Sequence, residues 1–326
     1  MARAGAPKPR VGPSPKLRGA ALPLWSGRAD VVEWAKGRLD ELVTLNATSV
    51  ELVVLGRQRD ATSVEVTRSP GAPSDADLTQ IIQAASERGL TVLLLPILEL
   101  TQVSDGDWRG TLRPADRERW WASYERFVLG YAELAQRAGV QWLGIGSELG
   151  STEGWRDRWY HLISETRRRF AGKLFYSANW DHYTAVSFWP RLDAIGISSY
   201  FTLAAGDDDS TAAMAQRWRG AQIALARYAD GLRLPLLLTE VGIPSRDGAA
   251  RAPWDYTREG PVDLEEQRRA FAALAASFIG RPILGVLVWE LASDGGIADA
   301  GYSPRGKPAW CALARWWRAA SPCPSP

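Results

Sequence analysis

Two glutamates stand at the ends of two short apolar segments of the chain. Residues 140–147 lead into Glu148, and residues 234–239 lead into Glu240. Apolar runs of this length, bracketed by glycine or proline, indicate buried strands. A carboxylate at the end of a buried strand costs free energy unless it has partners or a function. Glu148 and Glu240 are therefore the first candidates for chemistry in this sequence.

Apolar segments alternate with amphipathic ones along the whole chain, and this alternation predicts the elements that position the two glutamates. The expected strands are residues 19–25, 49–56, 91–98, 140–148, 173–178, 192–200, 234–240 and 283–289. The expected helices are residues 30–46, 73–88, 114–138, 155–170, 211–230, 263–279 and 307–320. Asp30 suits a helix N-cap, Pro114 suits a first helical turn, and Gly89 suits a helix stop.

Strict alternation of eight strands with helices, without a linker or a shift in composition, indicates an α/β fold with a single (β/α)8 TIM barrel. An open doubly wound sheet would also alternate, but no Gly-x-Gly-x-x-Gly follows the first expected strand. We expect one barrel domain over residues 19–320. A disordered or leader segment (1–18) precedes it, and a short tail (321–326) follows it.

The composition gives no reason to expect a nucleic-acid or membrane partner. The chain has 326 residues, 23% of them charged, with a net charge of only +2. No run of eighteen apolar residues is present, so we expect no membrane span. Sixteen tryptophans are unusual, and indole rings suit stacking on the flat apolar faces of sugars.

Two observations bear on the compartment, and they leave it open. Residues 1–18 are rich in proline, alanine and basic residues but lack an apolar core, so they do not resemble an intact signal peptide. Cys311 and Cys323 either form a disulfide in an oxidising compartment or remain two reduced thiols. A trimmed N-terminus favours a secreted or periplasmic protein, and an untrimmed one favours a cytoplasmic protein.

The active sites of TIM barrels lie at the C-terminal ends of the strands. Those ends carry, in chain order, Trp25, Arg57 with Gln58, Glu99, Glu148, Asn179 with Trp180, Tyr200, Glu240, and Trp289 with Glu290. Two facing carboxylates with aromatic platforms suit cleavage of a glycosidic bond. A separation of about 5–5.5 Å implies retention of configuration, and about 6.5–9.5 Å implies inversion.

Other chemistries find little support in the sequence. The only histidines, His161 and His182, lack metal-ligand spacing, so we expect no metal site. Neither the Gly-x-Ser-x-Gly elbow of serine hydrolases nor a phosphate-binding loop is present, and we expect no cofactor. Glu153 is expected to be a solvated loop residue. Glu290 is expected either to bind a sugar or to be a structural carboxylate.

Five segments resemble glycoside hydrolase family 113, a family of retaining β-mannanase-like barrels in clan A of the glycosidases. They are residues 108–110 (Trp-Arg-Gly), 144–149, 176–181, 188–197 together with Tyr200, and 239–242 (Thr-Glu-Val-Gly). The resemblance runs from about residue 19 to residue 310. The chain departs from the usual pattern at Ser147, where many clan A enzymes have asparagine, and at Ile97, where the family pattern has histidine.

The resemblance implies a role for each matching residue. Glu148 would be the acid/base and Glu240 the nucleophile, with Tyr200 hydrogen-bonded to Glu240. Glu148 would carry a proton near neutral pH, and Glu240 would stay ionised. The substrate-binding set would comprise Trp25, Trp108, Arg109, Asn179, Trp180, Tyr200 and Trp289, of which Trp108 and Arg109 lie on a loop over the site.

We therefore expect a monomeric retaining hydrolase that acts on a polysaccharide or oligosaccharide, most closely of the β-1,4-mannan or glucomannan type. Two alternatives remain open. One is a carbohydrate-binding barrel that has lost catalysis, and the other is a glycosidase that acts on another β-glycan.

Overall fold

The computed structural model describes residues 16–205, 209–278 and 283–320. Within these ranges, eight parallel strands close into a barrel in the order β1-β9-β8-β7-β6-β5-β4-β2, and β1 also pairs with β2. The strands are β1 (Leu17–Pro23), β2 (Ser49–Gln58), β4 (Thr91–Leu100), β5 (Trp142–Ser147), β6 (Lys173–Asn179), β7 (Ala194–Ser198), β8 (Leu236–Val241) and β9 (Gly285–Val288). The two-residue strand β3 (Thr67–Arg68) pairs antiparallel with the end of β2. The protein is a (β/α)8 TIM barrel, as expected from the sequence.

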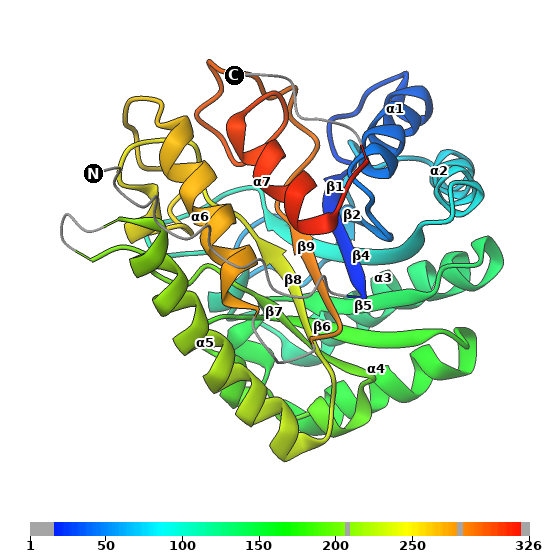
Figure 1. The fold of residues 1–326 in the computed structure, drawn as a ribbon. Coiled ribbons are helices and arrows are strands. Elements are labelled where there is room, and N and C mark those ends of the chain that lie inside the picture. The colour runs from blue at the N-terminus through cyan, green and yellow to red at the C-terminus, as the bar shows by residue number, and fades with distance from the viewer. Residues whose placement is uncertain (1–15, 206–208, 279–282, 321–326) are drawn as a thin grey trace, which may run out of the picture.

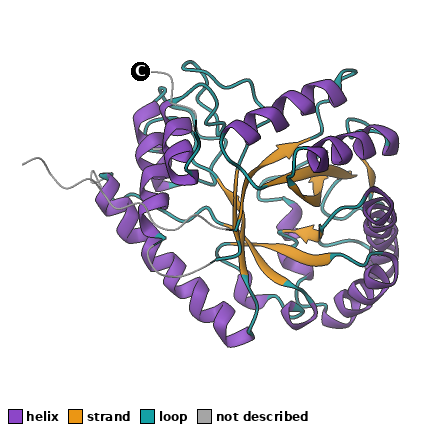
Figure 2. Cartoon of the chain, turned by 45° about the vertical axis from the view of Figure 1, so that its right-hand side comes forward, coloured by secondary structure: helices purple, strands orange, loops and turns teal. Residues whose placement is uncertain are grey.

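Helices surround the barrel on its outside (Figures 1 and 2). They are α1 (Val31–Thr44), α2 (Asp75–Glu87), α3 (Arg117–Ala138), α4 (Arg156–Arg169), α5 (Thr211–Leu232), α6 (Leu264–Ser277) and α7 (Pro308–Trp317). In Figure 1 the first strand lies next to the last one, because β1 pairs in register with β9 and closes the barrel. None of the described helices combines the length and the apolarity needed to cross a membrane.

Local capping explains where several helices begin. Ser74 accepts a hydrogen bond from the N–H of Asp77 and starts α2. Asp116 and Asp263 each accept two backbone N–H groups at the starts of α3 and α6. These bonds satisfy donors that have no partner inside the first helical turn.

Two expected helix starts differ from the structure. Asp30 occupies the N-cap position of α1 but makes no capping bond, because its carboxylate pairs with Arg28. Helix α3 begins at Arg117 rather than at Pro114, since Asp116 provides the cap. The first strand begins at Leu17, which lies inside the segment expected to be a leader. Residues 1–15 and 321–326, where most of the leader and the tail were expected, lie outside the described residues.

Alternate residues of each strand face either the helices or the barrel axis. The side chains that fill the inside of the barrel form one compact cluster of Leu17, Ala21, Val53, Leu93, Leu95, Ile97, Trp142, Phe175, Ala194, Leu237 and Leu287. Many tryptophans pack between the strands and the helices instead. Almost fully buried are Trp120, Trp121, Trp159, Trp189, Trp218, Trp316 and Trp317. Much of the high tryptophan content therefore builds the core rather than a sugar-binding surface.

Candidate active site

Glu148 directly follows β5 and is almost completely buried, with 6% of its surface exposed. Its backbone is left-handed, with φ of +54°, which is uncommon for a residue other than glycine. Its carboxylate has two donors from other elements. Ser198 Oγ donates to Oε1, and Arg109 Nη2 donates to Oε2 at 2.5 Å. Glu148 is thus held between the end of β7 and the loop that follows β4.

Glu240 lies within β8 and is 3% exposed. The hydroxyl of Tyr200 donates to its Oε2 at 2.8 Å, the hydrogen bond expected from the sequence. Ser198 is the register partner of Glu240 on the neighbouring strand. Because Ser198 contacts Glu148 and Tyr200 contacts Glu240, one short segment at the C-terminal end of β7 holds both carboxylates. The two glutamates therefore belong to one site at the C-terminal end of the barrel.

The two buried carboxylates and Arg109 interact electrostatically. Burial and the negative charge of Glu148 raise the pKa of Glu240 to about 7, although Arg109 and the Tyr200 hydrogen bond act in the opposite direction. The expectation that Glu240 stays fully ionised near neutral pH therefore differs from the structure. Two like charges buried together disfavour double ionisation, so the pair binds protons as a unit.

Two pairs of tryptophans lie around this end of the barrel. Trp25 and Trp289 are half-buried, with ring centroids 6.0 Å apart, and both pack on the cluster inside the barrel. Trp180 packs against Trp254, with centroids 5.3 Å apart. Trp254 lies in the loop between β8 and α6 and is 43% exposed. The sequence-based prediction missed Trp254 because it lies thirteen positions after the β8 strand end at Val241.

Three further residues of the expected substrate-binding set are Asn179, Trp108 and Trp180. Asn179 ends β6 and is half-buried, and its register partner is Ser198, which binds Glu148. Trp108 is 39% exposed, and its indole covers Gly110 so closely that a Cβ there would lie 2.3 Å from the ring. Among the described residues, the ring of Trp180 packs against the rings of Phe201 and Trp254, and not against an aromatic residue of the loop that follows Glu148.

The prediction that Glu153 is solvated is wrong. Its side chain is fully buried, accepts a hydrogen bond from Tyr176, and contacts the His182 ring. The loop after β5 turns inward through a short helical turn, so the position of Glu153 in a loop did not reveal its burial. Ser198 was also missed, although its position two residues before Tyr200 is a signal that both side chains point to the same side.

Two further polar residues, Glu290 and Ser147, lie near the ends of strands. Glu290 accepts backbone N–H groups from Ala292 and Ser293, and this supports the structural alternative for that residue. Ser147, which stands where many related enzymes have asparagine, is buried. Among the described residues its Oγ has no hydrogen-bond partner.

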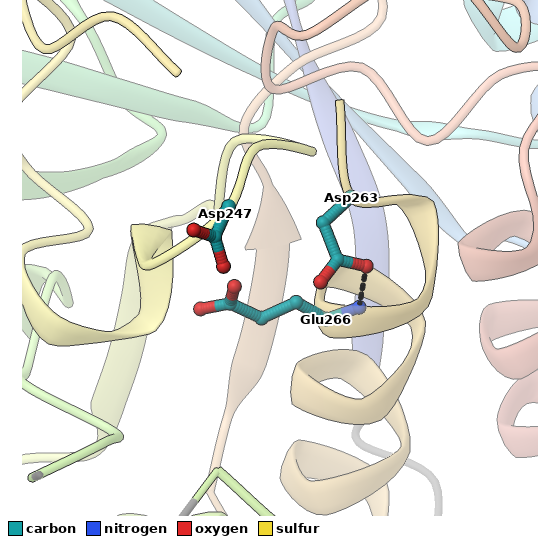
Figure 3. Close-up of side chains that lie close together, drawn as sticks. All are labelled: Asp247, Asp263 and Glu266. Carbon is teal, nitrogen blue, oxygen red and sulfur yellow. Dashed lines mark hydrogen bonds between the residues drawn. The ribbon is translucent and has the colours of Figure 1, made fainter. Parts of the chain in front are cut away.

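A group of three carboxylates, Asp247, Asp263 and Glu266, is the cluster best suited to hold a cation among the described residues (Figure 3). Their ligand oxygens lie within 4.8 Å of one another. However, Glu266 already accepts the N–H groups of Gly248 and Ala250, and Asp263 caps α6. These bonds tie the loop between β8 and α6 to the helix that follows, and they account for the placement of two of the three carboxylates.

Comparisons with known proteins agree with this fold. The profile of Glycoside Hydrolase Family 113 matches residues 29–299. The GH113 β-mannanase of Alicyclobacillus acidocaldarius, solved in complex with ManMIm, is 27% identical. It has a TM-score of 0.82 over 94% of this chain and 98% of that chain.

Two further structures share the fold. A GH113 β-1,4-mannanase solved as a complex is 22% identical, with a TM-score of 0.82 over 94% of this chain and 99% of the other. Another GH113 β-1,4-mannanase structure is 23% identical, with a TM-score of 0.79 over the same shares of the two chains. No curated protein matches the chain. Because the family profile covers most of the sequence, the chain belongs to glycoside hydrolase family 113.

Proposed function

We propose that this glycoside hydrolase cleaves β-1,4-mannan or glucomannan with retention of configuration, with Glu240 as nucleophile and Glu148 as acid/base. The observation that carries the proposal is the pair of buried carboxylates held by two donors at the C-terminal end of β7 and just beyond it. Ser198 binds Glu148 and Tyr200 binds Glu240. Two carboxylates at one site are what a double displacement requires.

In the first step, a carboxylate oxygen of Glu240 attacks the anomeric carbon. Oε1 suits this role because Tyr200 occupies Oε2, whereas Oε1 has no hydrogen-bond partner among the described residues. The bond to the leaving sugar breaks, its electron pair stays on the leaving oxygen, and that oxygen takes the proton of Glu148. The products are a glycosyl ester of Glu240 and a released saccharide with a free hydroxyl group.

In the second step, water attacks the same carbon from the face that the leaving sugar vacated. Glu148, now a carboxylate, takes a proton from the water, and the ester bond to Glu240 breaks. Both carboxyl groups return to their starting protonation states. Two inversions at one carbon give overall retention, so the β configuration is kept.

The assigned roles require a proton transfer before the first step. Arg109 donates to Glu148, while burial raises the pKa of Glu240 to about 7. Near neutral pH the two carboxyl groups of the free enzyme therefore share a proton as a pair. Catalysis by the assigned roles requires that proton on Glu148 once the substrate is bound. The same observation favours a second assignment, in which Glu240 is the acid and Glu148 is the nucleophile.

Two substitutions distinguish these assignments. Glu240→Ala should abolish turnover of every substrate, because a nucleophile is needed whatever the leaving group. Glu148→Ala should lose cleavage of mannan but keep glycosylation by a dinitrophenyl β-mannoside, whose phenolate leaves without an acid. Added azide should then accelerate this residual reaction and give a β-mannosyl azide. Azide rescue of Glu240→Ala with a β-mannosyl azide product, together with rescue of Glu148→Ala with an α-mannosyl azide product, would show that the roles are reversed.

The choice of mannan rests on two relatives described as β-1,4-mannanases and a third described as a β-mannanase. It is tested by the turnover of a panel of β-1,4-linked manno-, gluco- and xylo-oligosaccharides, with product configuration followed by NMR. Release of β-configured mannose ends supports the proposal. Cleavage of only a non-mannan oligosaccharide reassigns the substrate, and binding without cleavage of any of them favours the catalytically silent barrel.

A further inference from the structure

The loop that follows Glu148 contains a second buried carboxylate, Glu153, which takes no part in the reaction described above. Its Oε1 accepts a hydrogen bond from Tyr176 at 2.7 Å, and its Oε2 lies 2.5 Å from His182 Nδ1. Its backbone carbonyl accepts the hydroxyl of Ser187 at 2.7 Å. A carboxylate is rarely buried completely unless it is paired and hydrogen-bonded in this way.

The same hydrogen-bonded chain reaches the backbone beside Glu148. The N–H of Leu149 donates to the hydroxyl of Tyr176 at 2.7 Å, so this hydroxyl links the peptide after Glu148 to Glu153. Tyr176 is fully buried, and its ring packs edge-on against Trp159 and Phe188, with centroids 5.3 and 5.1 Å away. The phenol oxygen therefore has little freedom to move.

The backbone at Glu148 needs such support. A left-handed conformation is unfavourable for a residue with a side chain, and Glu148 has φ of +54°. Two consecutive N–H groups hold it in place: Glu148 donates to the carbonyl of Ser177, and Leu149 donates to Tyr176. The two acceptor residues, Tyr176 and Ser177, are consecutive in β6. The direction in which the Glu148 side chain leaves the backbone thus depends on how firmly Tyr176 is held.

The chain of bonds also adjoins the turn that carries Arg109. A Cβ on Gly150 would lie 3.2 Å from the carbonyl oxygen of Gly110 and 3.6 Å from His182 Nδ1. The loop after Glu148 therefore packs directly against the residue that follows Arg109, and Arg109 in turn donates to Glu148. Movement of this loop would disturb the carboxylate from two sides.

We propose that Glu153, Tyr176 and His182 form a positioning relay that fixes the backbone of Glu148 and so aims its carboxyl group at the leaving oxygen. This inference rests on the proposed function, because it assigns to the relay the step in which Glu148 donates a proton. None of the three residues touches the substrate in this scheme. Burial raises the pKa of Glu153, and the bonds from Tyr176 and His182 offset part of that cost.

The test uses the leaving-group dependence of the rate. Glu153→Gln, Tyr176→Phe and His182→Asn are each assayed on mannotetraose and on dinitrophenyl β-mannoside. The first substrate needs an acid for its sugar leaving group, and the second does not. If the relay aims Glu148, kcat on mannotetraose should fall about 10- to 100-fold, the cost of a misplacement of about 1 Å. The kcat/KM of the dinitrophenyl substrate, which reports glycosylation and not the later base-assisted step, should change by less than about threefold, and KM for mannotetraose should be preserved.

His161 gives a matched control. It contacts Glu125 through Nε2 at 3.3 Å on the outer helices, so it forms the same type of pair away from the site. His161→Asn should leave both activities unchanged. Tyr176 is fully buried, and Tyr176→Phe could fail to fold. In that case Glu153→Gln and His182→Asn decide, since the His182 side chain is 46% exposed and tolerates replacement more readily. Equal losses on both substrates, or no loss on mannotetraose, would overturn the relay.

A spectroscopic readout tests the contacts independently of activity. The chain has only two histidines, so their side-chain N–H signals are easily assigned by NMR. The Nδ1–H of His182 should be protected from exchange in the wild type and lost in Glu153→Ala, while the His161 signals stay unchanged. An unprotected His182 signal in the wild type would contradict the relay. If the wild type cleaves neither mannoside, the proposed function fails. If it cleaves both and the relay variants lose both equally, only the relay fails.

Discussion

Replacing Glu240 by glutamine should stabilise the protein, and the gain should depend on pH. The pKa of Glu240 is raised from 4.5 to about 7 in the folded protein, mainly by burial and by the charge of Glu148. Between these two values the unfolded chain has lost the proton while the folded protein still holds it. The wild type therefore loses stability as pH rises from about 4.5 to about 7. Glutamine is neutral at every pH and can still accept the hydrogen bond of Tyr200, so Glu240→Gln avoids this loss.

The size of the effect follows from the same shift. A difference of about 2.5 pH units, at about 1.4 kcal/mol per unit, amounts to roughly 3 kcal/mol. Glu240 is 3% exposed, so solvent screens little of this energy. Because Glu148 and Glu240 are coupled, the figure belongs to the pair. With an unfolding entropy of about 2.1 cal/mol/K per residue over the barrel, it corresponds to a Tm increase of about 5 °C.

The assay compares the free energy of unfolding of wild type and Glu240→Gln in urea at several pH values from 4 to 8.5. The difference should be small at the lowest pH, grow through the range from about 4.5 to 7, and then level off. Glu259→Gln, at an exposed position, is the control and should show no such growth. A difference that stays flat, or one that shrinks as pH rises, would refute the argument that Glu240 is the group forced to hold its proton.

Three further outcomes are expected. Tyr200→Phe removes a hydrogen bond that lowers the pKa of Glu240, so the acidic limb of the pH–rate profile should move to higher pH. The expected shift is about one unit, because hydrogen bonds to charged groups contribute about 1.5–3 kcal/mol. An unmoved limb would contradict this. Glu51→Met should raise the free energy of unfolding at pH 8 by about 1–3 kcal/mol. The reason is that the pKa of the fully buried Glu51 is well above normal and its oxygens have no hydrogen-bond partner among the described residues. Glu51→Gln should gain less stability in the same urea titration. Trp289→Ala should raise KM for mannotetraose roughly fivefold through the loss of about 1 kcal/mol of stacking, and a changed kcat with unchanged KM would count against a binding role.

The sequence determined much of the barrel because the relevant signals are local. Apolar segments of strand length alternate with amphipathic segments, and each strand–helix unit repeats this pattern. The expected strands overlap β1, β2, β4, β5, β6, β7, β8 and β9. The boundaries moved by one or more residues where a cap decided them, as when Asp116 rather than Pro114 started α3. Propensity indicates that a helix forms nearby, but the exact start depends on which side chain reaches the free N–H groups.

The sequence also placed Glu148 and Glu240 at the ends of strands, and closure of the barrel brings such ends together. These inferences need only the spacing of residues and the rule that the C-terminal ends of the strands form one face of the barrel.

Only the tertiary structure decided how charge is distributed around the two glutamates. Arg109 comes from the loop after β4, and its contact with Glu148 depends on how that loop packs on Gly150. The burial of Glu153 likewise depends on the ring of Tyr176 and on His182, which arrive from β6 and the loop beyond it. A pKa is set by burial and by neighbouring charges within a few ångströms, and these neighbours are distant in sequence. Sequence spacing could therefore locate the two carboxylates but could not show that burial and the charge of Glu148 raise the pKa of Glu240.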